Sequence, residues 1–358
     1  GLATPMSILV AAARGATAGI LVRDAAALEN LARAEVLVID KTGTLTEGRP
    51  RVTEIGVAAG HGAEESARAT DRLLAEAAAV EALSEHPLSG AILAEAAARG
   101  LTVPAVRDFV SEPGGGARGL VEGRRVAIGT ARFAFGGAAI PDDLNAALGP
   151  LEAAGRTIAF VAVDSRPAGF VAVADPLRPG AAAAVAALVA DGLDLVLATG
   201  DREAAALAVA GQVGIAAVHA AIDPAGKRAL VESLRKAGRR VAMAGDGVND
   251  APALAAADSG IALGTGTDVA IGTAGLTLVR GDLAALVRAR RLSRGTLRNI
   301  RQNLAFAFGY NALCVPIAAG VFYPLLGWTL SPMLAAAAMS LSSVTVIANA
   351  LRLRRLPL

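Results

Sequence analysis

The hydrophobic pattern of the chain begins with short apolar runs that alternate with longer Ala-rich stretches. Three of these runs, at residues 35–39, 193–198 and 240–244, each lead into a loop that carries Gly and Asp. Short β-branched runs separated by helical stretches predict βαβ units and therefore a parallel sheet. Ligands of such sheets bind where the loops leave the carboxyl ends of the strands, so we expect the chemistry in these loops.

A long segment interrupts this alternation between the first and the second run. It extends roughly over residues 51–173 and contains Gly-rich turns and strand-like stretches such as 157–163. Alternating apolar and polar positions predict strands rather than helices. We therefore expect an inserted second domain.

A stretch without charged residues marks the C-terminal part of the chain. Residues 302–351 include no Asp, Glu, Lys, Arg or His. At about 1.5 Å per residue, a helical run of this length could cross a hydrocarbon layer of about 30 Å twice. A turn in its middle is marked by Tyr323, Pro324, Gly327 and Pro332. We expect a transmembrane helical hairpin at 304–322 and 333–351, and the alternative is a buried helical pair of a soluble protein.

Arginines flank this hairpin on both sides, which places both of its ends on the cytoplasmic side of a membrane. They are Arg288, Arg290, Arg291, Arg294, Arg298 and Arg301 before it and Arg352, Arg354 and Arg355 after it.

Composition agrees with a chain that lies partly in lipid. Hydrophobic residues make up 54% of the sequence but aromatic residues only 3%, and the formal net charge is +2. The charge is close to balance without a long basic run, so nucleic acid is not an expected partner. The single cysteine, Cys314, and three scattered histidines predict neither a disulfide framework nor a structural zinc site.

The strongest chemical signal directly follows the first apolar run, in the sequence Asp-Lys-Thr-Gly-Thr-Leu-Thr at residues 40–46. A carboxylate at a strand end, followed by Thr and Gly whose amides can surround an oxyanion, suits attack on a phosphoryl group. Asp40 is the candidate nucleophile, with Lys41 and Thr42 beside it. Phosphatases with such a sheet tend to carry an acid two residues after the nucleophile, where this chain has Thr42. Without that acid the acyl phosphate should persist.

The other two loops carry parts that match this chemistry. Thr199, Gly200 and Asp201 supply a hydroxyl and a loop amide that could hold the transferred phosphate. Asp246 and Asp250 supply carboxylates for Mg²⁺, which would bridge the phosphoryl oxygens to Asp40. The predicted magnesium ligands are Asp40, Thr42, Asp246 and Asp250. Lys227, one of three lysines in the chain, is the candidate for neutralising charge at the phosphate.

These motifs resemble the phosphorylation, phosphate-binding and hinge motifs of P-type ATPases. The resemblance covers residues 40–46, 199–201 and 245–254, and extends over essentially the whole chain. Residues 175–178, Asp-Pro-Leu-Arg, also resemble the segment that re-enters the phosphorylation domain after the nucleotide insertion. The implied fold is α/β, with a Rossmann-like parallel-sheet phosphorylation domain, an inserted α+β nucleotide-binding domain and transmembrane helices.

The resemblance divides the chain into five parts. They are the end of a transmembrane helix and a cytoplasmic stalk (1–27), the first part of the phosphorylation domain (28–50), the nucleotide-binding domain (51–172), the second part of the phosphorylation domain (173–290), and a stalk with the C-terminal hairpin (291–358). The apolar start of the chain resembles the continuation of a helix, so we expect a larger protein with the family's Cys-Pro-Cys motif upstream of Gly1.

Within the insertion, the resemblance to the heavy-metal subgroup implies a site for ATP. His86 and Pro87 match its histidine-proline motif, in which the imidazole positions the adenine, and Glu81 matches an adenine-contacting glutamate. Gly114, Gly116 and Gly119 form a GxGxxG pattern that permits close backbone approach to a nucleotide. One departure is Thr130, which stands where the subgroup has Asn after Gly129.

The expected transported ion is monovalent copper. Met339, Ser342 and Ser343 lie on one face of the second predicted span, and Tyr310 and Asn311 lie in the first. From the residues alone, hydrogen bonding between helices explains them about as well. The arrangement resembles the copper(I) subgroup, with its Tyr-Asn and Met-x-x-Ser-Ser signatures, and a soft thioether suits a soft ion. Silver or a divalent metal is the alternative ion.

The resemblance implies ATP-driven copper export through an aspartyl-phosphate, in a multi-pass protein of the bacterial plasma membrane. The implied partners are membrane lipid, an N-terminal half with the actuator domain and upstream transmembrane helices, and a copper chaperone. A fragment without the actuator domain should bind nucleotide and phosphorylate itself slowly, without transport. The competing class is a soluble phosphatase of the same sheet family.

Overall fold

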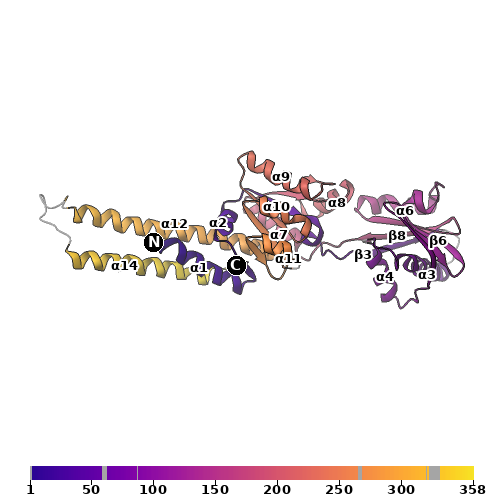
Figure 1. Ribbon diagram of the computed structural model, residues 1–358, viewed down its shortest axis with the longest axis horizontal. Coiled ribbons are helices and arrows are strands. Elements are labelled where there is room, and N and C mark those ends of the chain that lie inside the picture. The colour runs from indigo at the N-terminus through magenta and orange to yellow at the C-terminus, as the bar shows by residue number, and fades with distance from the viewer. Residues whose placement is uncertain (1, 59–62, 87, 265–267, 320, 322–330) are drawn as a thin grey trace. The chain divides into compact units, whose positions relative to one another are not determined.

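The computed structural model describes the chain except for residues 1, 59–62, 87, 265–267, 320 and 322–330 (Figure 1). The chain divides into two compact units. The first unit consists of Gly1–Asp40, Gly180–Ala198 and Ile222–Leu358, and the second of Lys41–Pro179 and Thr199–Ala221.

A mainly parallel sheet forms the centre of the first unit. Its strands lie in the order β1 (Ile20–Val22), β13 (Leu276–Leu278), β12 (Ser259–Leu263), β11 (Val241–Gly245), β2 (Val36–Asp40) and β9 (Asp194–Ala198). β1 pairs with β13 in the antiparallel direction, whereas the pairings of β13 with β12, β12 with β11, β11 with β2 and β2 with β9 are parallel. β2, β9 and β11 match the three runs that the sequence predicts to be strands, so the expected parallel sheet is confirmed.

Both faces of this sheet are buried, which explains why its central strands are continuous apolar runs. On one face Val38, Val196 and Met243 pack against α9 (Pro224–Lys236) and α10 (Ala251–Ala256). The alternate residues Leu37 and Ile39 are fully buried as well. Among the other helices, α2 (Ala25–Arg33) contacts β12, α7 (Ala181–Ala190) contacts β9, and α12 (Leu283–Ala318) contacts both of these helices. A short helix, α11 (Asp268–Thr273), follows β12.

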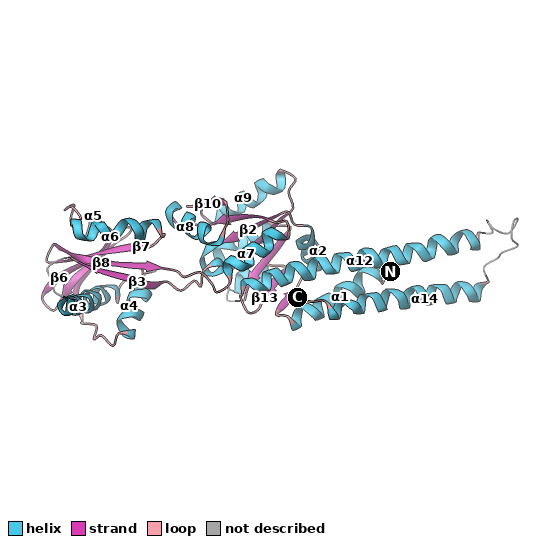
Figure 2. Ribbon diagram, turned by 180° about the vertical axis from the view of Figure 1, so that it is seen from behind, coloured by secondary structure: helices cyan, strands magenta, loops and turns pink. Residues whose placement is uncertain are grey.

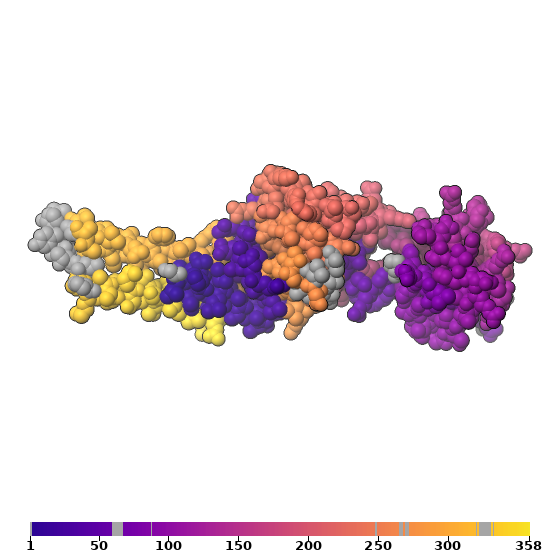
Figure 3. Space-filling model, viewed as in Figure 1, coloured from indigo at the N-terminus to yellow at the C-terminus, as the bar shows by residue number. Residues whose placement is uncertain are grey.

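Three helices extend the first unit away from the sheet. α12 runs side by side with α14 (Pro332–Leu351), and α1 (Ala3–Thr17) packs against both (Figures 1 and 3). A 3₁₀ turn, η3 (Arg352–Arg355), ends α14. The helices begin where the sequence offers caps, because the side chains of Asp282 and Ser331 accept hydrogen bonds from the backbone amides of Ala285 and Leu334.

The charged stalk and the first predicted span form one continuous helix. α12 begins at Leu283 and passes through the predicted boundary at residue 290 without a break. The predicted turn at residues 323–327 lies outside the described residues, whereas Pro332 begins α14. By length and composition, one helix among the described residues could span a membrane, Met333–Arg355, and it is largely unburied.

A buried polar network that no sequence pattern predicted joins α1, α12 and α14. The Ser7 hydroxyl donates to Asn299 Oδ1 at 2.8 Å, and Asn303 Nδ2 donates to Ser7 Oγ at 2.9 Å. Asn349 Nδ2 donates to Asn303 Oδ1 at 2.9 Å, and Asn299 Nδ2 donates to the backbone oxygen of Asn349 at 2.8 Å. All four side chains are buried. The network therefore fixes the register of the three helices.

Replacing Asn303 with leucine should weaken this three-helix junction. The change leaves Ser7 and Asn349 buried without a partner at Asn303, which costs about 2 kcal/mol. We expect a melting temperature in detergent that is lower by several degrees. Asn311→Leu is the matched control, because Asn311 lies on the same helix and is exposed. Equal melting of the two variants would show that the network adds no stability.

A six-stranded antiparallel sheet forms the centre of the second unit (Figure 2). Its strands lie in the order β3 (Arg51–Val57), β8 (Arg166–Ala174), β7 (Thr157–Val163), β6 (Arg124–Gly129), β5 (Gly116–Val121) and β4 (Val106–Glu112). β7 coincides with the strand predicted at 157–163. The expected α/β fold with a second, inserted sheet is therefore confirmed.

Successive side chains along the central strands of this second sheet point to opposite faces, and each face packs into a separate hydrophobic core. Val161 and Val171 face α3 (Ala63–Glu81) and α4 (Ser89–Ala98). Phe160 and Phe170 face the other side, which α5 (Ala131–Ala134) and α6 (Asp142–Ala153) cover. This unit also holds a kinked turn, η1 (Lys41–Leu45), and the elements α8 (Glu203–Val213) and β10 (Ala217–His219).

Candidate active site

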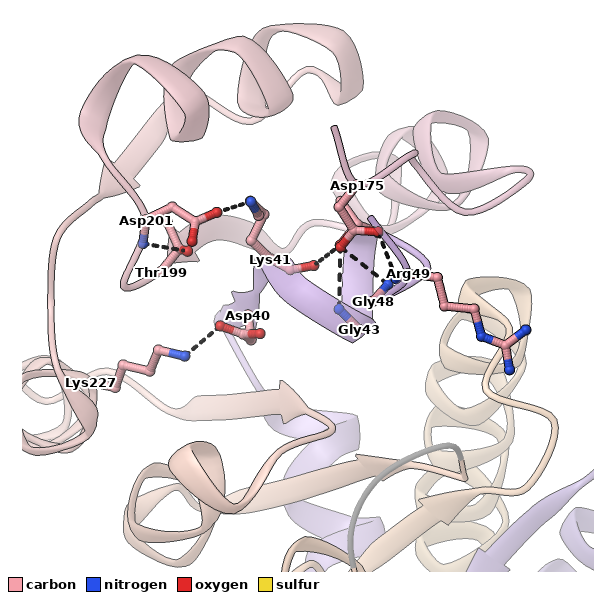
Figure 4. Close-up of polar contacts among 10 residues, drawn as sticks. Asp40, Lys41, Gly43, Gly48, Arg49, Asp175, Thr199, Asp201 and Lys227 are labelled. Atoms are coloured by element: carbon pink, nitrogen blue, oxygen red, sulfur yellow. Dashed lines mark hydrogen bonds and ion pairs between the residues drawn. The ribbon is translucent and has the colours of Figure 1, made fainter. Parts of the chain in front are cut away.

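Asp40 lies at the carboxyl end of β2, in the middle of the parallel sheet, and is 4% exposed. The side chain of Lys227 points at it from α9 (Figure 4). Lys227 Nζ contacts Asp40 Oδ1 and also donates to Asp250 Oδ1 at 2.7 Å. One ammonium group therefore bridges the predicted nucleophile and a carboxylate from the loop after β11.

The position of Lys227 follows from the local sequence. Asp223 caps α9 by accepting a hydrogen bond from Gly226 N at 2.7 Å, and Pro224 occupies the first helical position. These two residues fix the start of the helix, and Lys227 lies within its first turn. The predicted role of Lys227 next to the nucleophile agrees with this placement.

Three carboxylates gather at this sheet edge, from Asp40, Asp246 and Asp250. Their oxygen atoms lie within 4.8 Å of one another. Glycine is required at 245 because a Cβ there would lie 2.5 Å from Asp250 Oδ2. The turn η2 (Val248–Asp250) brings Asp250 back toward β11, where it is 2% exposed.

Burial and charge shift the ionisation of this cluster. Burial, and then repulsion from Asp250, raise the pKa of Asp40 to about 7 although Lys227 opposes the shift. Burial by itself lowers the pKa of Lys227, but Asp40 and Asp250 outweigh it and leave the pKa above its ordinary value. Lys227 therefore remains charged, whereas Asp40 takes up a proton at a higher pH than an exposed aspartate does.

This donor set fits Mg²⁺, a hard cation that prefers carboxylate oxygens. The three carboxylates repel one another, and the single charge of Lys227 does not balance them. Asp40, Asp246 and Asp250 would hold the ion. Thr42, the fourth predicted ligand, is exposed, and its side chain has no carboxylate.

In the second unit, Lys41 and the loop of residues 199–201 form another polar group. The ammonium of Lys41 forms an ion pair with Asp201 (Figure 4). The amide of Asp201 donates to Thr199 Oγ1 at 3.1 Å, and the amide of Thr199 donates to the backbone oxygen of His219 at 2.9 Å. Thr199 is 2% exposed. The loop is thus held in one conformation with a hydroxyl near a backbone amide.

Chain connectivity links these groups to Asp40. Lys41 follows Asp40 directly, and Thr199 follows Ala198, which is the register partner of Asp40 in the pairing of β2 with β9. The predicted nucleophile and the predicted phosphate-binding loop therefore start from paired ends of neighbouring strands.

Asp175 orders the loop that follows the kinked turn, a role that the sequence motifs did not predict. Its Oδ2 accepts from Thr46 Oγ1 at 2.5 Å and from Gly48 N at 3.1 Å, and its Oδ1 accepts from Arg49 N at 3.0 Å (Figure 4). Arg178 donates to the backbone oxygen of Gly43 at 2.5 Å, and Gly43 has a φ of +72°, which favours glycine. The segment 175–178 therefore fixes the conformation of the loop after Lys41.

Asp175→Asn should loosen this loop. Asparagine offers one acceptor oxygen where three donors converge, so about 1–3 kcal/mol of local stability is lost. We expect faster hydrogen exchange at the amides of Gly48 and Arg49, measured on peptides by mass spectrometry. Glu152→Gln, at an exposed position of α6, controls for the loss of a negative charge. Unchanged exchange at both amides would contradict this role.

The residues predicted to bind nucleotide lie in the second unit, in the part of the sequence that runs from the end of α3 into β5. Glu81 is buried and accepts a hydrogen bond from the Ser89 hydroxyl. His86 is exposed, and its Nδ1 accepts from Leu88 N at 3.3 Å. Pro87 lies outside the described residues. Ser89 links the two residues, because its amide also donates to the backbone oxygen of His86 at 3.0 Å.

Sheet packing gives the glycine pattern a further reason. A Cβ at Gly116 would lie 2.2 Å from the backbone oxygen of Ile128, and one at Gly119 would lie 2.3 Å from Val106. Packing alone therefore requires two of the three predicted glycines, whereas the space beside Gly114 is open. Thr130, the departure from the subgroup, caps α5 by accepting from Phe133 N.

The residues of the predicted ion pathway lie on α12 and α14. The Tyr310 hydroxyl lies 3.5 Å from Thr345 Oγ1, and the Ser343 hydroxyl donates to the backbone oxygen of Met339 at 3.2 Å. Ser342 is partly buried, whereas Asn311 is exposed and Met339 is 57% exposed. Thr345 was not predicted, although it follows Ser342 by one helical turn and so shares its face.

Comparison with known proteins adds independent findings. The haloacid dehalogenase-like hydrolase family matches residues 34–258. The chain is 54% identical to a copper-transporting P-type ATPase of Rhizobium leguminosarum bv. viciae, over 99% of this chain and 41% of that protein. It is 51% identical to a silver exporting P-type ATPase of Salmonella typhimurium, over 99% of this chain and 42% of that protein.

A solved structure is similar over nearly the whole chain. The crystal structure of a zinc-transporting PIB-type ATPase in its E2.Pi state matches with a TM-score of 0.83 and 39% identity, covering 98% of this chain and 55% of that one. The chain spans less than half the length of these two curated relatives, 41% and 42%. The three proteins are named for three different metals.

Proposed function

Because the chain belongs to the haloacid dehalogenase-like hydrolases and, within them, to the heavy-metal-transporting P-type ATPases, we propose that it takes part in ATP-driven export of monovalent copper through an aspartyl-phosphate on Asp40. The observation that carries this proposal is the buried group of Asp40, Asp246, Asp250 and Lys227 at one edge of the parallel sheet. It combines a nucleophile, a cation and a donor set for Mg²⁺.

The proposed reaction is transfer of the γ-phosphoryl group of ATP to Asp40. A carboxylate oxygen of Asp40 forms a bond to the γ-phosphorus, the bond from this phosphorus to the bridging oxygen breaks, and ADP leaves with that electron pair. When bound, Mg²⁺ neutralises charge on the phosphoryl oxygens. Lys227 holds the attacking carboxylate in place and offsets the charge of Asp250. The ionised fraction of Asp40 provides the nucleophile.

Persistence of the adduct favours a pump over a phosphatase. Hydrolysis of an aspartyl-phosphate needs a general base for water, and Thr42 has no such group. His86 and Glu81 support recognition of the adenine, and Lys41 and Thr199 support binding of the transferred phosphate. ATP and Mg²⁺ are therefore the cofactors that we propose for this chain.

The choice of copper depends on the membrane helices. A thioether at Met339 suits a soft monovalent ion, and Tyr310, Asn311, Ser342 and Ser343 supply polar groups on the same two helices. The relative from Rhizobium leguminosarum is named for copper, and this supports the same ion here. Silver shares this soft chemistry, so it is the nearest alternative substrate.

We also propose the setting in which this activity occurs. The protein would be a multi-pass protein of a bacterial plasma membrane, in contact with lipid. The actuator domain and further transmembrane helices would come from an N-terminal half of the same pump. A copper chaperone would deliver the ion.

Ion-stimulated ATP hydrolysis by the full-length gene product in membrane vesicles tests this function. We expect Cu(I) to stimulate hydrolysis more than Zn(II), and Met339→Leu to weaken the stimulation by Cu(I). Zinc as the best activator would overturn the choice of copper. Rapid hydrolysis of small phosphomonoesters by the chain without detergent, with no acid-stable phosphoenzyme, would instead favour the soluble phosphatase.

A further inference from the structure

A buried arginine joins α12 to the parallel sheet at the end opposite Asp40. Arg290 is 5% exposed, although it lies on a helix that elsewhere presents arginines to solvent. Its Nε donates to Asp191 Oδ2 at 3.0 Å, and one terminal nitrogen donates to the backbone oxygen of Ala34 at 3.1 Å. The other terminal nitrogen contacts the backbone oxygen of Leu31. The guanidinium thus binds three partners from two segments.

These partners lie at the bases of the two strands that lead to the candidate active site. Leu31 and Ala34 belong to the end of α2, directly before β2, which carries Asp40 at its other end. Asp191 is the C-cap of α7, directly before β9, which leads to Thr199. β2 and β9 are neighbours in parallel register, Val36 with Asp194 and Asp40 with Ala198. One side chain therefore holds the starts of both strands.

The helix that carries Arg290 also carries part of the candidate ion pathway. α12 continues from Leu283 to Ala318 and includes Tyr310, about 30 Å beyond Arg290 at ~1.5 Å per residue. In the other direction Asp40 lies one five-residue strand away, roughly 16 Å at ~3.3 Å per residue. Helices and strands are the stiffest connections that a chain offers. Arg290 lies where α12 contacts the segment that leads into β2.

The chemistry of this joint requires arginine rather than any cation. A planar guanidinium donates in fixed directions to a carboxylate and to two carbonyl groups at once, whereas the ammonium of lysine is a compact point charge. The carbonyl groups at the end of α2 carry the negative end of the helix dipole, so a cation is favoured there. Moving this buried guanidinium away from its three partners is costly, because its charge would then be buried without a partner.

We propose that Arg290 is a positioning residue that couples α12 to the bases of β2 and β9, so that displacement of α12 on ion binding and the placement of Asp40 change together. This inference rests on the proposed function, since coupling has meaning only in a pump. Nothing in it requires Arg290 to touch ATP or the metal ion.

Arg290→Lys in the full-length gene product tests the proposal, with Arg294→Lys as the matched control. Arg294 contacts the same Asp191 from the same helix, but its side chain is 47% exposed, and it donates to the backbone oxygen and to a carboxylate oxygen of Asp191 rather than to the end of α2. Two quantities are measured in vesicles, the level of phosphoenzyme formed from ATP and the factor by which Cu(I) stimulates turnover. We expect Arg290→Lys to keep the phosphoenzyme level within about twofold while the stimulation factor falls about tenfold. Arg294→Lys should change neither.

A purely structural role predicts another pattern, in which phosphoenzyme and stimulated turnover fall together in proportion to the folded protein. That result, or an equal loss in Arg294→Lys, would overturn the coupling role. Should Arg290→Lys fail to accumulate, Asp191→Asn decides the question, because it weakens the contacts of Arg290 and Arg294 at the base of β9 and leaves those of Arg290 with α2 in place. An unchanged stimulation factor in Asp191→Asn would then overturn the proposal. If the unsubstituted protein forms no phosphoenzyme, the proposed function itself fails and this inference with it.

Discussion

Asp40→Asn is expected to abolish the acid-stable phosphoenzyme that the unsubstituted protein forms from ATP, a loss of about 10³-fold or more. The amide of asparagine is not a nucleophile toward phosphorus, and it cannot become one by losing a proton at neutral pH. The variant should still fold, because asparagine keeps an oxygen that can accept from Lys227 and no longer repels Asp250. The measurement is incorporation of label from γ-labelled ATP after acid quenching.

Asp194→Asn is the matched control for this experiment. Asp194 begins β9, the strand beside β2, and its side chain is 70% exposed at the end of the sheet that lies away from Asp40. The Asp194→Asn variant should be labelled as strongly as the unsubstituted protein. Equal labelling of Asp40→Asn would mean that another residue is the nucleophile.

Asp40→Asn is also expected to differ in stability from the unsubstituted protein in a way that depends on pH. The pKa of Asp40 is raised from 3.8 to about 7 in the fold, so the folded protein binds this proton more tightly than the unfolded chain. The stability that this proton contributes is present at low pH and is lost as the pH rises through about 7. In the presence of a chelator, the melting temperature of Asp40→Asn minus that of the unsubstituted protein should therefore increase from pH 4 to pH 7. A constant difference over this range would contradict the raised pKa.

Much of the architecture could be predicted because the chain obeys strong local rules. The strands around Asp40 are short apolar runs that end in Gly- and Asp-bearing loops, and a strand buried on both faces allows few other sequences. Successive side chains of a strand point to opposite faces, which places Phe160 and Val161 of residues 157–163 in separate cores. Residues that are paired by such rules end at the same sheet edge. The loops that carry Thr199 and Asp246 could therefore be expected beside Asp40, whereas Lys227 could be proposed only as one of three lysines in the chain.

Other features could not be predicted because they depend on contacts between distant segments. The partners of Arg290 lie at residues 31, 34 and 191, and nothing in an Arg-rich helix marks which arginine is buried. Ser7, Asn303 and Asn349 likewise become a network only once three helices pack together. The role of Asp175 depends on amides more than a hundred residues earlier. Sequence patterns identify elements and motifs, but the contacts between distant elements are seen only in the folded structure.

Lys227→Met is expected to slow phosphoenzyme formation from ATP by about 10²–10³-fold, while Asp40 itself remains in place. A preorganised charge next to developing negative charge typically contributes about 3–4 kcal/mol to the barrier. Methionine preserves much of the volume of the lysine stem but leaves Asp40 and Asp250 without the ammonium that they share. The pKa of Asp40 should then rise further, because Lys227 is what lowers it. Less carboxylate is available for attack, and the repulsion between the carboxylates increases.

Rapid-quench measurement of the labelling rate distinguishes this effect from a loss of fold. Lys236→Met is the matched control, since Lys236 ends the same helix and lies beside Arg239 and Arg240, away from Asp40. It should be labelled at the rate of the unsubstituted protein. Lys227→Arg should recover part of the rate, because the charge is retained although the guanidinium is larger than the ammonium it replaces. A rate for Lys227→Met within about threefold of the unsubstituted protein would show that the contact between Lys227 and Asp40 does not serve phosphoryl transfer.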